Sequence, residues 1–419
     1  TGLYEQLTYG HNNTFINDVS ADSRYLLFST SEQDYISLPH SSNSMYKLDL
    51  QSMAVDTLWE RAKYINGATF SPDGKQLMVF GSGNAFDNIG LNIKEGQISN
   101  TYDGQLFLYD PATRKAKALT KDFNPNVTSA QWNKFDGQIY MLTEDQDYQR
   151  VYTCNPANGK IRRLDLPEDV IYNYSLAEAA PVMYYYGQSV SNANRLYSYN
   201  TKSKKTQLIY DLSADKLKDI QFGEVHDWNF TSTDGTIIQG RYYLPPNFDA
   251  SRKYPMIVYY YGGTSPTNRA LEFSYSMHMY AALGYVVYTL NPSGTTGFGQ
   301  EFAARHVNAW GDKTADEIIQ GTEQFCKEHF GQYFNRVVVE MTENEEMNDI
   351  YMERKRATGG KDQIEFALDD FGSGFNSEIN IIEVQPSYVK IDKSFVENIV
   401  NDPYRQEMVK NTIDYCKRH

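Results

Sequence analysis

The sequence predicts a partial β-propeller of about four blades, followed by an α/β layer that combines two incomplete series of strands and helices. Three observations predict this fold class. Residues 1–212 alternate short apolar and polar runs between turn pairs. Residues 213–329 alternate apolar strands with amphipathic helices, and residues 330–419 repeat short βα units.

The first region carries the signature of consecutive hairpins. Its segments are rich in Tyr, Thr, Ser and Asn, and a loose repeat recurs at a spacing of roughly 40 to 60 residues, which suits four-stranded propeller blades. A β-sandwich is the alternative that this pattern leaves open. The turn pairs that close the predicted hairpins are Asp73-Gly74, Asp136-Gly137 and Asn158-Gly159.

Composition and charge narrow the class of partner. The 419-residue chain is 41% hydrophobic, enough for a sizeable core, and has a formal net charge of −14. Nucleic acid and anionic membranes would repel such a chain, so a peptide or a small molecule is the expected ligand. Cys154, Cys326 and Cys416 form no CxxC pair, so neither a disulfide framework nor a zinc site is expected.

The sequence also predicts a soluble protein without a membrane span. No stretch approaches the ~20 consecutive apolar residues that a transmembrane helix needs. The chain opens at Thr1 with neither a basic nor an apolar leader segment, so a targeting peptide is expected to be absent or removed.

After Asp211 the pattern changes to alternating strands and helices. A hairpin closed by Asp234-Gly235 precedes the apolar strand "YPMIVYYYGG", and a helix ending at Gly284 precedes the second apolar strand "YVVYTLNPSG". The amphipathic helix "KTADEIIQGTEQFCKEH" follows. This order predicts a largely parallel sheet covered by helices.

Three motifs in residues 1–329 resemble the prolyl oligopeptidase and dipeptidyl peptidase IV family of serine peptidases. They are "YYYGGTSP", "YAALGYVVYTLNPSGTTGFGQEF" and "AWGDKTADEIIQGTEQF". The resemblance implies a β-propeller set over an α/β-hydrolase domain. It also implies that Tyr261 corresponds to the tyrosine whose hydroxyl stabilises the oxyanion of the transition state.

The catalytic set that this family requires is incomplete. No Gly-x-Ser-x-Gly motif occurs anywhere, and His419 is the only histidine after residue 330. His226, His278 and His306 precede the expected position of the nucleophile, so we interpret them as scaffold or surface residues. A chain without nucleophile and base cannot form an acyl-enzyme, so we expect a peptidase scaffold truncated before its nucleophile, inactive and without a cofactor in this part.

Residues 330–419 carry a second set of chemically useful side chains. Glu340, Asp369, Asp370 and Lys390 all lie near the carboxyl ends of predicted strands, where side chains of a barrel converge on its active site. On the sequence pattern alone, an Asp-Asp pair before Phe-Gly is more often a turn or a helix cap.

The motifs "VEMTE", "LDDFGSGF" and "YVKIDKSFV" are similar to the EAL family of cyclic di-GMP phosphodiesterases. The resemblance implies that Glu340, Asp369 and Asp370 are metal ligands and that Glu343 steadies the loop after the Asp pair. It further implies that Lys390 orients or activates the attacking water. Mg²⁺ or Mn²⁺ would be the cofactor and cyclic di-GMP the partner, since these hard ions prefer carboxylate oxygens.

The EAL-like part is incomplete as well. The Glu-Ala-Leu segment and an asparagine ligand are not present before residue 330, and about three βα units cannot close an eight-stranded (β/α) barrel. We therefore expect the partial barrel to share one composite layer with the partial α/β-hydrolase. The chain is interpreted as a chimera with boundaries 1–212, 213–329 and 330–419, formed by fusion, recombination or artificial joining.

Three functions follow as alternatives. The first is an inactive peptidase scaffold, the second a metal-dependent cyclic di-GMP phosphodiesterase or binding remnant, and the third an interaction module that uses the propeller face. The longer, peptidase-like part favours a periplasmic or extracellular location, whereas EAL enzymes act on a cytoplasmic messenger.

Overall fold

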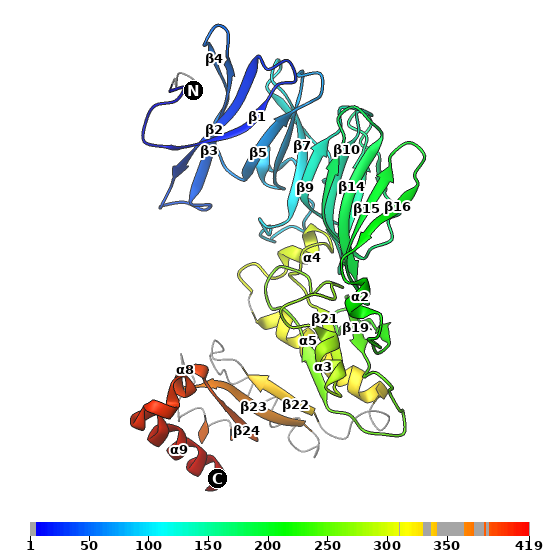
Figure 1. Ribbon diagram of the computed structural model, residues 1–419. Coiled ribbons are helices and arrows are strands. Elements are labelled where there is room, and N and C mark those ends of the chain that lie inside the picture. Colours follow the sequence, from blue (N-terminus) through cyan, green and yellow to red (C-terminus); the bar gives the residue numbers. More distant parts are fainter. Residues whose placement is uncertain are drawn as a thin grey trace. The chain divides into compact units, whose positions relative to one another are not determined.

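The computed structural model describes residues 6–309, 311–329, 337–341, 364–372, 381–382 and 385–418. The chain divides into two compact units, one of Thr1–Phe248 with Ile257–Gln324 and one of Asp249–Met256 with Phe325–His419. Figure 1 shows a run of β-sheets and a mixed region with helices in the larger unit, and a short sheet with helices in the smaller one.

The larger unit begins with two four-stranded antiparallel sheets whose strands pair in chain order. Both sheets contribute to one core, in which Leu27 and Met45 of the first sheet lie with Phe70, Val79 and Phe107 of the second. The strands are β1 (Asn13–Val19), β2 (Tyr25–Gln33), β3 (Ser41–Asp49), β4 (Val55–Ala62), β5 (Ile65–Phe70), β6 (Leu77–Ser82), β7 (Gly104–Asp110) and β8 (Lys115–Ala118), and the short helix α1 (Ala85–Asn88) follows β6.

Side chains connect these two sheets. The Ala68 backbone N–H of β5 donates to Asn17 Oδ1 of β1 at 3.3 Å, and the Phe70 backbone N–H donates to Asp18 Oδ2 at 2.8 Å. Two backbone N–H groups at the edge of the second sheet therefore donate to a side-chain amide and a carboxylate, rather than to the backbone of a neighbouring strand.

The next eight strands form one sheet made of two groups of four. Within each group, consecutive strands are antiparallel, and the groups meet where β11 and β13 pair in parallel at Gln149 and Val170. Each group has the pairing of a propeller blade. The strands are β9 (Asn126–Trp132), β10 (Ile139–Asp145), β11 (Tyr148–Cys154), β12 (Ile161–Arg163), β13 (Val170–Leu176), β14 (Val182–Ser189), β15 (Asn192–Asn200) and β16 (Thr206–Asp211).

The hairpins predicted at three turn pairs are confirmed. Gly74 lies between β5 and β6, Gly137 between β9 and β10, and Gly159 between β11 and β12. Their φ values are 71°, 68° and 69°, a left-handed conformation that glycine adopts without the steric cost of a Cβ. The Asp or Asn before each glycine belongs to the tight turn.

A five-stranded sheet with helices completes the larger unit. Its path is β17-β19-β21-β20, and β18 pairs with β19. The expectation of a largely parallel sheet is wrong for β17, β18, β19 and β21, because β19 pairs antiparallel with the other three. The short turn at Gly235 joins β18 to β19, and so short a connection permits only antiparallel pairing.

Two helices in this region were expected from the sequence. The amphipathic one forms as α5, whereas the other is shorter than expected and spans only α3, before Gly284 with its φ of 94°. The elements are α2 (Ala214–Leu217), β17 (Val225–Asp227), β18 (Phe230–Thr231), β19 (Ile237–Tyr243), β20 (Met256–Tyr259), α3 (Met277–Ala282), β21 (Val286–Asn291), α4 (Gln300–Ala304) and α5 (Asp312–His329).

The smaller unit contains a separate three-stranded parallel sheet in the order β22-β23-β24. Leu368, Phe371 and Ile381 form its core, and Val389 and Tyr415 pack against them. The elements are β22 (Val337–Met341), β23 (Ile364–Phe371), β24 (Tyr388–Ile391), α8 (Lys393–Val396), the 3₁₀ helix η1 (Ile399–Asn401) and α9 (Pro403–Arg418).

The expected composite layer is therefore wrong for the described strands. β22 pairs with β23, the next strand of its own βα series, while β17 to β21 form a sheet of their own. Consecutive parallel strands joined by a crossover pair with each other readily, which explains why β22 does not extend the earlier sheet. The described strands form no closed barrel. Among the helices that the structure describes, none offers the extended apolar stretch that a membrane span requires.

Candidate functional site

The parallel sheet of the smaller unit brings two of the predicted site residues together. Asp369 lies near the end of β23 and Lys390 lies in the neighbouring strand β24. Lys390 Nζ is 2.9 Å from Asp369 Oδ1, and the two side chains are 47% and 22% exposed. The pair is an ion pair that water and a dissolved ligand can reach.

A shift of register explains how the Asp pair meets the lysine. Leu368 pairs with Val389, but Phe371 pairs with Ile391, so Asp369 and Asp370 stand opposite the single residue Lys390. Two residues opposite one is the arrangement of a β-bulge, which re-aims side chains and is frequent beside active sites. The motif "LDDF" therefore marks a bulge at the carboxyl end of a strand, rather than the turn or helix cap that was the other interpretation of an Asp pair.

The remaining predicted metal ligands are only partly described. Glu340 of β22 stands opposite Ala367 in the register, two residues before Asp369, but its side chain lies outside the described part of the structure. The side chain of Asp370 and the whole of Glu343 lie outside it as well. Among the side chains that are described, no three acidic, His or Cys groups gather closely enough to hold a metal ion. Asp369 offers the oxygen donor that Mg²⁺ or Mn²⁺ prefers, and the predicted metal site stays a prediction.

In the larger unit, Tyr261 follows strand β20 by two residues and is 54% exposed. A Cβ atom at Gly263 would lie 2.6 Å from Cζ and 2.8 Å from Oη of Tyr261, so the glycine leaves room for the ring. The phenol is thus accessible and rests on the backbone of the "YYYGG" motif. Its predicted role as an oxyanion donor stays a prediction.

The motif "NPSGTTGFGQ" joins the hydrolase-like sheet to the β-strand groups. Thr296 donates from Oγ1 to Glu144 Oε2 of β10 at 2.6 Å, and Gln146 N donates to the carbonyl of Gly297 at 3.0 Å. On its other side, Ser293 donates from N and Oγ to Glu317 of α5 at 2.6 and 2.7 Å. This loop is buried and positions the two parts of the unit on each other.

A buried charge cluster makes a second connection between the same parts. Asp147, in the turn between β10 and β11, accepts from Arg241 Nη1 at 2.7 Å and lies 2.9 Å from Arg269 Nε. The side chains of Asp147 and Arg241 are each 1% exposed. Burial alone would lower the pKa of Arg269, but Asp147, Tyr148 and Asp227 together raise it above its ordinary value.

Sequence reasoning did not identify this cluster. One signal was present, because Arg241 lies within the largely apolar strand "IIQGRYY", and a buried arginine requires a partner. The partner lies 94 positions earlier in the chain, and nothing local to Asp147 points to it.

The three histidines occupy different surroundings. His226 is exposed and lies 2.9 Å from Glu224 Oε2, as a surface residue would. His306 is buried, and a Cβ atom at Gly294 would lie 2.2 Å from its Cβ, so it packs on the loop after β21. His278 is also buried and lines a pocket.

Comparison with curated proteins confirms the resemblance to dipeptidyl peptidases. The chain is 25% identical over 317 residues to dipeptidyl-peptidase 5 of Porphyromonas gingivalis, covering 74% of this chain and 44% of that protein. It is also 25% identical over 282 residues to a probable dipeptidyl-peptidase 5 of Aspergillus terreus, covering 62% of this chain and 35% of that protein. The chain spans less than half the length of these relatives.

Solved peptidase structures share the fold. The acylaminoacyl peptidase of Pyrococcus horikoshii, in its orthorhombic crystal form, has a TM-score of 0.57 at 16% identity, over 84% of this chain and 63% of that one. Dipeptidyl peptidase 4 of Porphyromonas gingivalis has a TM-score of 0.54 at 12% identity, over 96% of this chain and 74% of that one. Peptidases of this kind combine a propeller with an α/β-hydrolase fold.

The EAL domain family matches residues 299–419. The resemblance of the C-terminal part to this family is confirmed by that match, which begins ahead of the expected boundary at residue 330 and overlaps the peptidase-like part. The boundaries 1–212, 213–329 and 330–419 stay a prediction.

Proposed function

We propose that residues 1–329 form a serine-peptidase scaffold of the dipeptidyl and prolyl oligopeptidase type, which presents a surface for peptides but does not carry out acyl transfer. The similar proteins are peptidases, and the four groups of strands are proposed to be blades of a partial propeller. A periplasmic or extracellular location would suit this part of the chain.

The observation that carries the proposal is the sequence and the pairing of the next described strand after α5. In the peptidase family, the nucleophile elbow Gly-x-Ser-x-Gly follows a strand at this point of the chain. Here the next described strand is β22, which begins at Val337, carries the sequence VVVEM and pairs with β23. A charged oxyanion needs a nucleophile to create it, so Tyr261 alone supports binding rather than turnover.

The proposal is tested with chromogenic Xaa-Pro and Xaa-Ala dipeptide substrates. The purified chain should show no hydrolysis above the buffer rate and no labelling by a fluorophosphonate probe. Tyr261→Phe and its neighbour Tyr260→Phe form a matched pair, since both side chains are exposed. Hydrolysis that disappears in Tyr261→Phe and survives in Tyr260→Phe would show that the chain is an active peptidase.

A second function is favoured by the contact between Asp369 and Lys390. We propose that the smaller unit is a remnant of a metal-dependent cyclic di-GMP phosphodiesterase that retains weak binding of Mg²⁺ or Mn²⁺. Adjacent carboxylates repel each other, and a divalent cation relieves this repulsion. Bound metal would polarise a phosphodiester and its attacking water. Asp369 would contribute an oxygen ligand, and Lys390 would hold that carboxylate in place.

Titration of Mn²⁺ into the native chain and into the Asp369→Asn, Asp370→Asn double variant tests this second function. Asp414→Asn is the matched control, because it removes an exposed carboxylate from α9 of the same unit. We expect weak binding that the double variant loses and the control keeps, without linear dinucleotide product from cyclic di-GMP. Equal binding in all three proteins would reject the site, and product formation would show that the remnant is an enzyme.

The joining of two resemblances in one chain is proposed to reflect a chimera. Sequencing the gene across the codons for residues 325–335 tests the origin of the junction. An uninterrupted reading frame in a natural genome would exclude artificial joining.

A further inference from the structure

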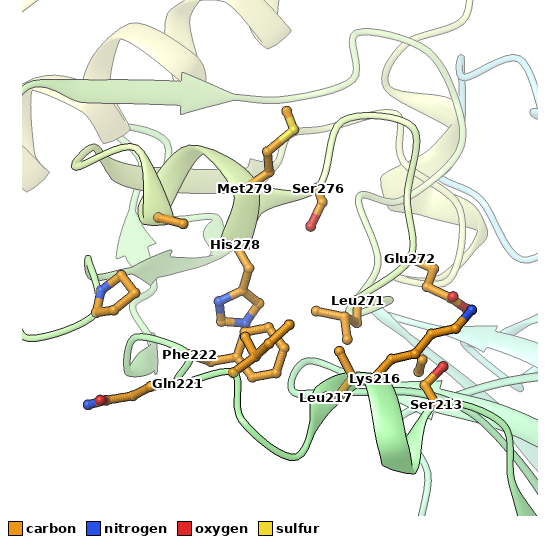
Figure 2. A pocket seen from close by; sticks show the side chains of 14 residues that line it. Ser213, Lys216, Leu217, Gln221, Phe222, Leu271, Glu272, Ser276, His278 and Met279 are labelled. Atoms are coloured by element: carbon orange, nitrogen blue, oxygen red, sulfur yellow. The ribbon is translucent and has the colours of Figure 1, made fainter.

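A pocket lies in the larger unit, where α2 and the segment after it meet the segment before α3 and α3 itself. Figure 2 shows its lining side chains, and its volume is about 390 Å³. This volume falls in the range of pockets that hold small molecules, roughly 300 to 1,000 Å³. The pocket contains neither Tyr261 nor any of the predicted metal ligands.

His278 supplies an unusual polar group in this pocket. It is 6% exposed, and neither ring nitrogen completes a hydrogen bond, although the backbone of Val190 lies close enough to favour the protonated ring. The ring packs against Phe222 and Tyr243 at centroid distances of 4.7 and 5.1 Å. Burial lowers the pKa of His278, so the ring is neutral near pH 7 and can donate one hydrogen bond and accept one.

Two opposite charges mark another side of the pocket. Figure 2 shows the side chains of Lys216, from α2, and Glu272 extending towards each other there. Glu272 is held in place, because its Oε2 accepts from Asn194 Nδ2 at 3.2 Å and its backbone N–H donates to Gln188 Oε1 at 2.6 Å. A ligand with a single charge would be attracted by one of the two rim groups and repelled by the other. A ligand with both charges side by side matches both.

The walls between these polar groups are apolar. Leu217 and Leu271 lie between the charged side and His278 in Figure 2, and Phe222 lies against the histidine ring. An apolar body that spans these walls would be removed from water, which contributes roughly 25 cal/mol for each Å² of apolar surface buried. A polar tip on that body would reach His278, whose open ring nitrogen is costly to leave unsatisfied.

We propose that this pocket binds a free α-amino acid with an aromatic side chain that carries a hydrogen-bonding group, of which tyrosine is the simplest. The ammonium group lies beside Glu272, the carboxylate beside Lys216 and the hydroxyl beside His278. The aromatic ring lies between Leu217 and Leu271. This site is independent of peptidase turnover.

The ligand series L-tyrosine, L-phenylalanine, tyramine and 3-(4-hydroxyphenyl)propionate tests each part of the proposal by calorimetry. Each of the last three lacks one group of tyrosine. We expect each to bind about 5-fold to 10-fold more weakly, as the loss of one hydrogen bond or charge contact predicts. Equal affinities for all four compounds, or no heat with any of them, would overturn the proposal.

Variants of exposed residues test the location without disturbing the core. Lys216→Ala should weaken tyrosine binding by about 5-fold or more, whereas Lys218→Ala, two positions later and outside the pocket, should not. Ala282→Trp fills the pocket from the exposed side of α3 and should abolish binding. Unchanged affinity in Lys216→Ala and Ala282→Trp would place bound tyrosine elsewhere and reject the site.

Nuclear magnetic resonance provides a readout at the histidine itself. The chain has 7 histidines. Tyrosine should shift the ring nitrogen signals of His278 and leave those of His226 in place, while L-phenylalanine should shift the His278 nitrogens much less. Tyrosine binding without any change at His278 would reject the proposed contact.

Discussion

The carboxylate of Asp147 contacts two guanidinium groups, and Asp147→Asn removes its negative charge while keeping the shape of the side chain. Arg241 donates to Asp147 Oδ2 at 2.7 Å, and Arg269 Nε lies 2.9 Å from the same oxygen. Gln239 donates to Asp147 Oδ1 at 3.0 Å. An asparagine can retain one or two of these contacts, but it leaves two positive charges side by side, with only the largely exposed Asp227 still paired with Arg269.

The size of the effect follows from burial. Arg241 and Asp147 are each 1% exposed and the side chain of Arg269 is 10% exposed, so water cannot replace the lost carboxylate. Removing one partner of a buried ion pair costs about 3 to 5 kcal/mol of unfolding free energy. At about 2 °C per kcal/mol for a unit of this size, the midpoint of thermal unfolding should fall by about 6 to 10 °C.

Asp56→Asn is the matched control. Asp56 lies 2.6 Å from Arg114, but these side chains are 51% and 43% exposed, so the loss should stay below about 1 kcal/mol. Both variants and the native chain are compared by differential scanning calorimetry and by urea unfolding followed by tryptophan fluorescence. If the two variants lower the midpoint equally, the buried cluster does not hold the two parts of the unit together.

Three further predictions concern buried polar groups and close backbone contacts. Burial raises the pKa of Asp103 to about 7, so the folded chain keeps a proton that the unfolded chain releases near pH 4. The unfolding free energy should therefore fall as the pH rises from about 4 to about 7, and Asp103→Asn should remove this part of the dependence; parallel pH profiles would contradict the assignment. Gly223→Ala places a Cβ 1.7 Å from the Leu244 carbonyl oxygen, so the unfolding free energy measured in urea should fall by about 1 to 3 kcal/mol. An unfolding midpoint equal to that of the native chain would contradict the close approach. Glu317→Ala leaves the N–H and the hydroxyl of Ser293 buried without their acceptor, so unfolding free energy should drop by about 2 kcal/mol or more, and less than 0.5 kcal/mol would show that another group takes over.

Local signals in the sequence predicted the local structure well. Glycines after Asp or Asn marked the hairpins at Gly74, Gly137 and Gly159, because a tight turn needs a left-handed backbone at a single position and glycine adopts it easily. The charged and apolar periodicity of "KTADEIIQGTEQFCKEH" predicted α5 in the same way. The helix before Gly284 was expected to be longer, and α3 covers only its second half.

Pairing over long distances was harder to predict. The order of strands and helices suggested a parallel sheet and a composite layer, but pairing depends on which edges meet, and short segments do not encode that choice. For the functional residues, too, local motifs were predicted and distant partners were not. The motif "LDDF" identified Asp369, and the neighbouring strand supplied Lys390 as expected. Arg241 found its partner in a turn far along the chain, which no spacing indicates.

Neighbouring groups of strands are joined in two ways, by side chains or by backbone pairing, and these two kinds of junction should differ in their tolerance of mutation. Beside their shared core, the first two groups are linked by hydrogen bonds to the side chains of Asn17 and Asp18, so a single substitution at either position removes one of these links. The junction between the third and fourth groups is made by main-chain groups of β11 and β13, and the backbone N–H of Gln149 donates to the carbonyl of Asp169 at 3.0 Å. Only proline at position 149 deletes that donor. Side-chain substitutions should therefore weaken the contact between the first two groups more readily than the backbone pairing between the last two.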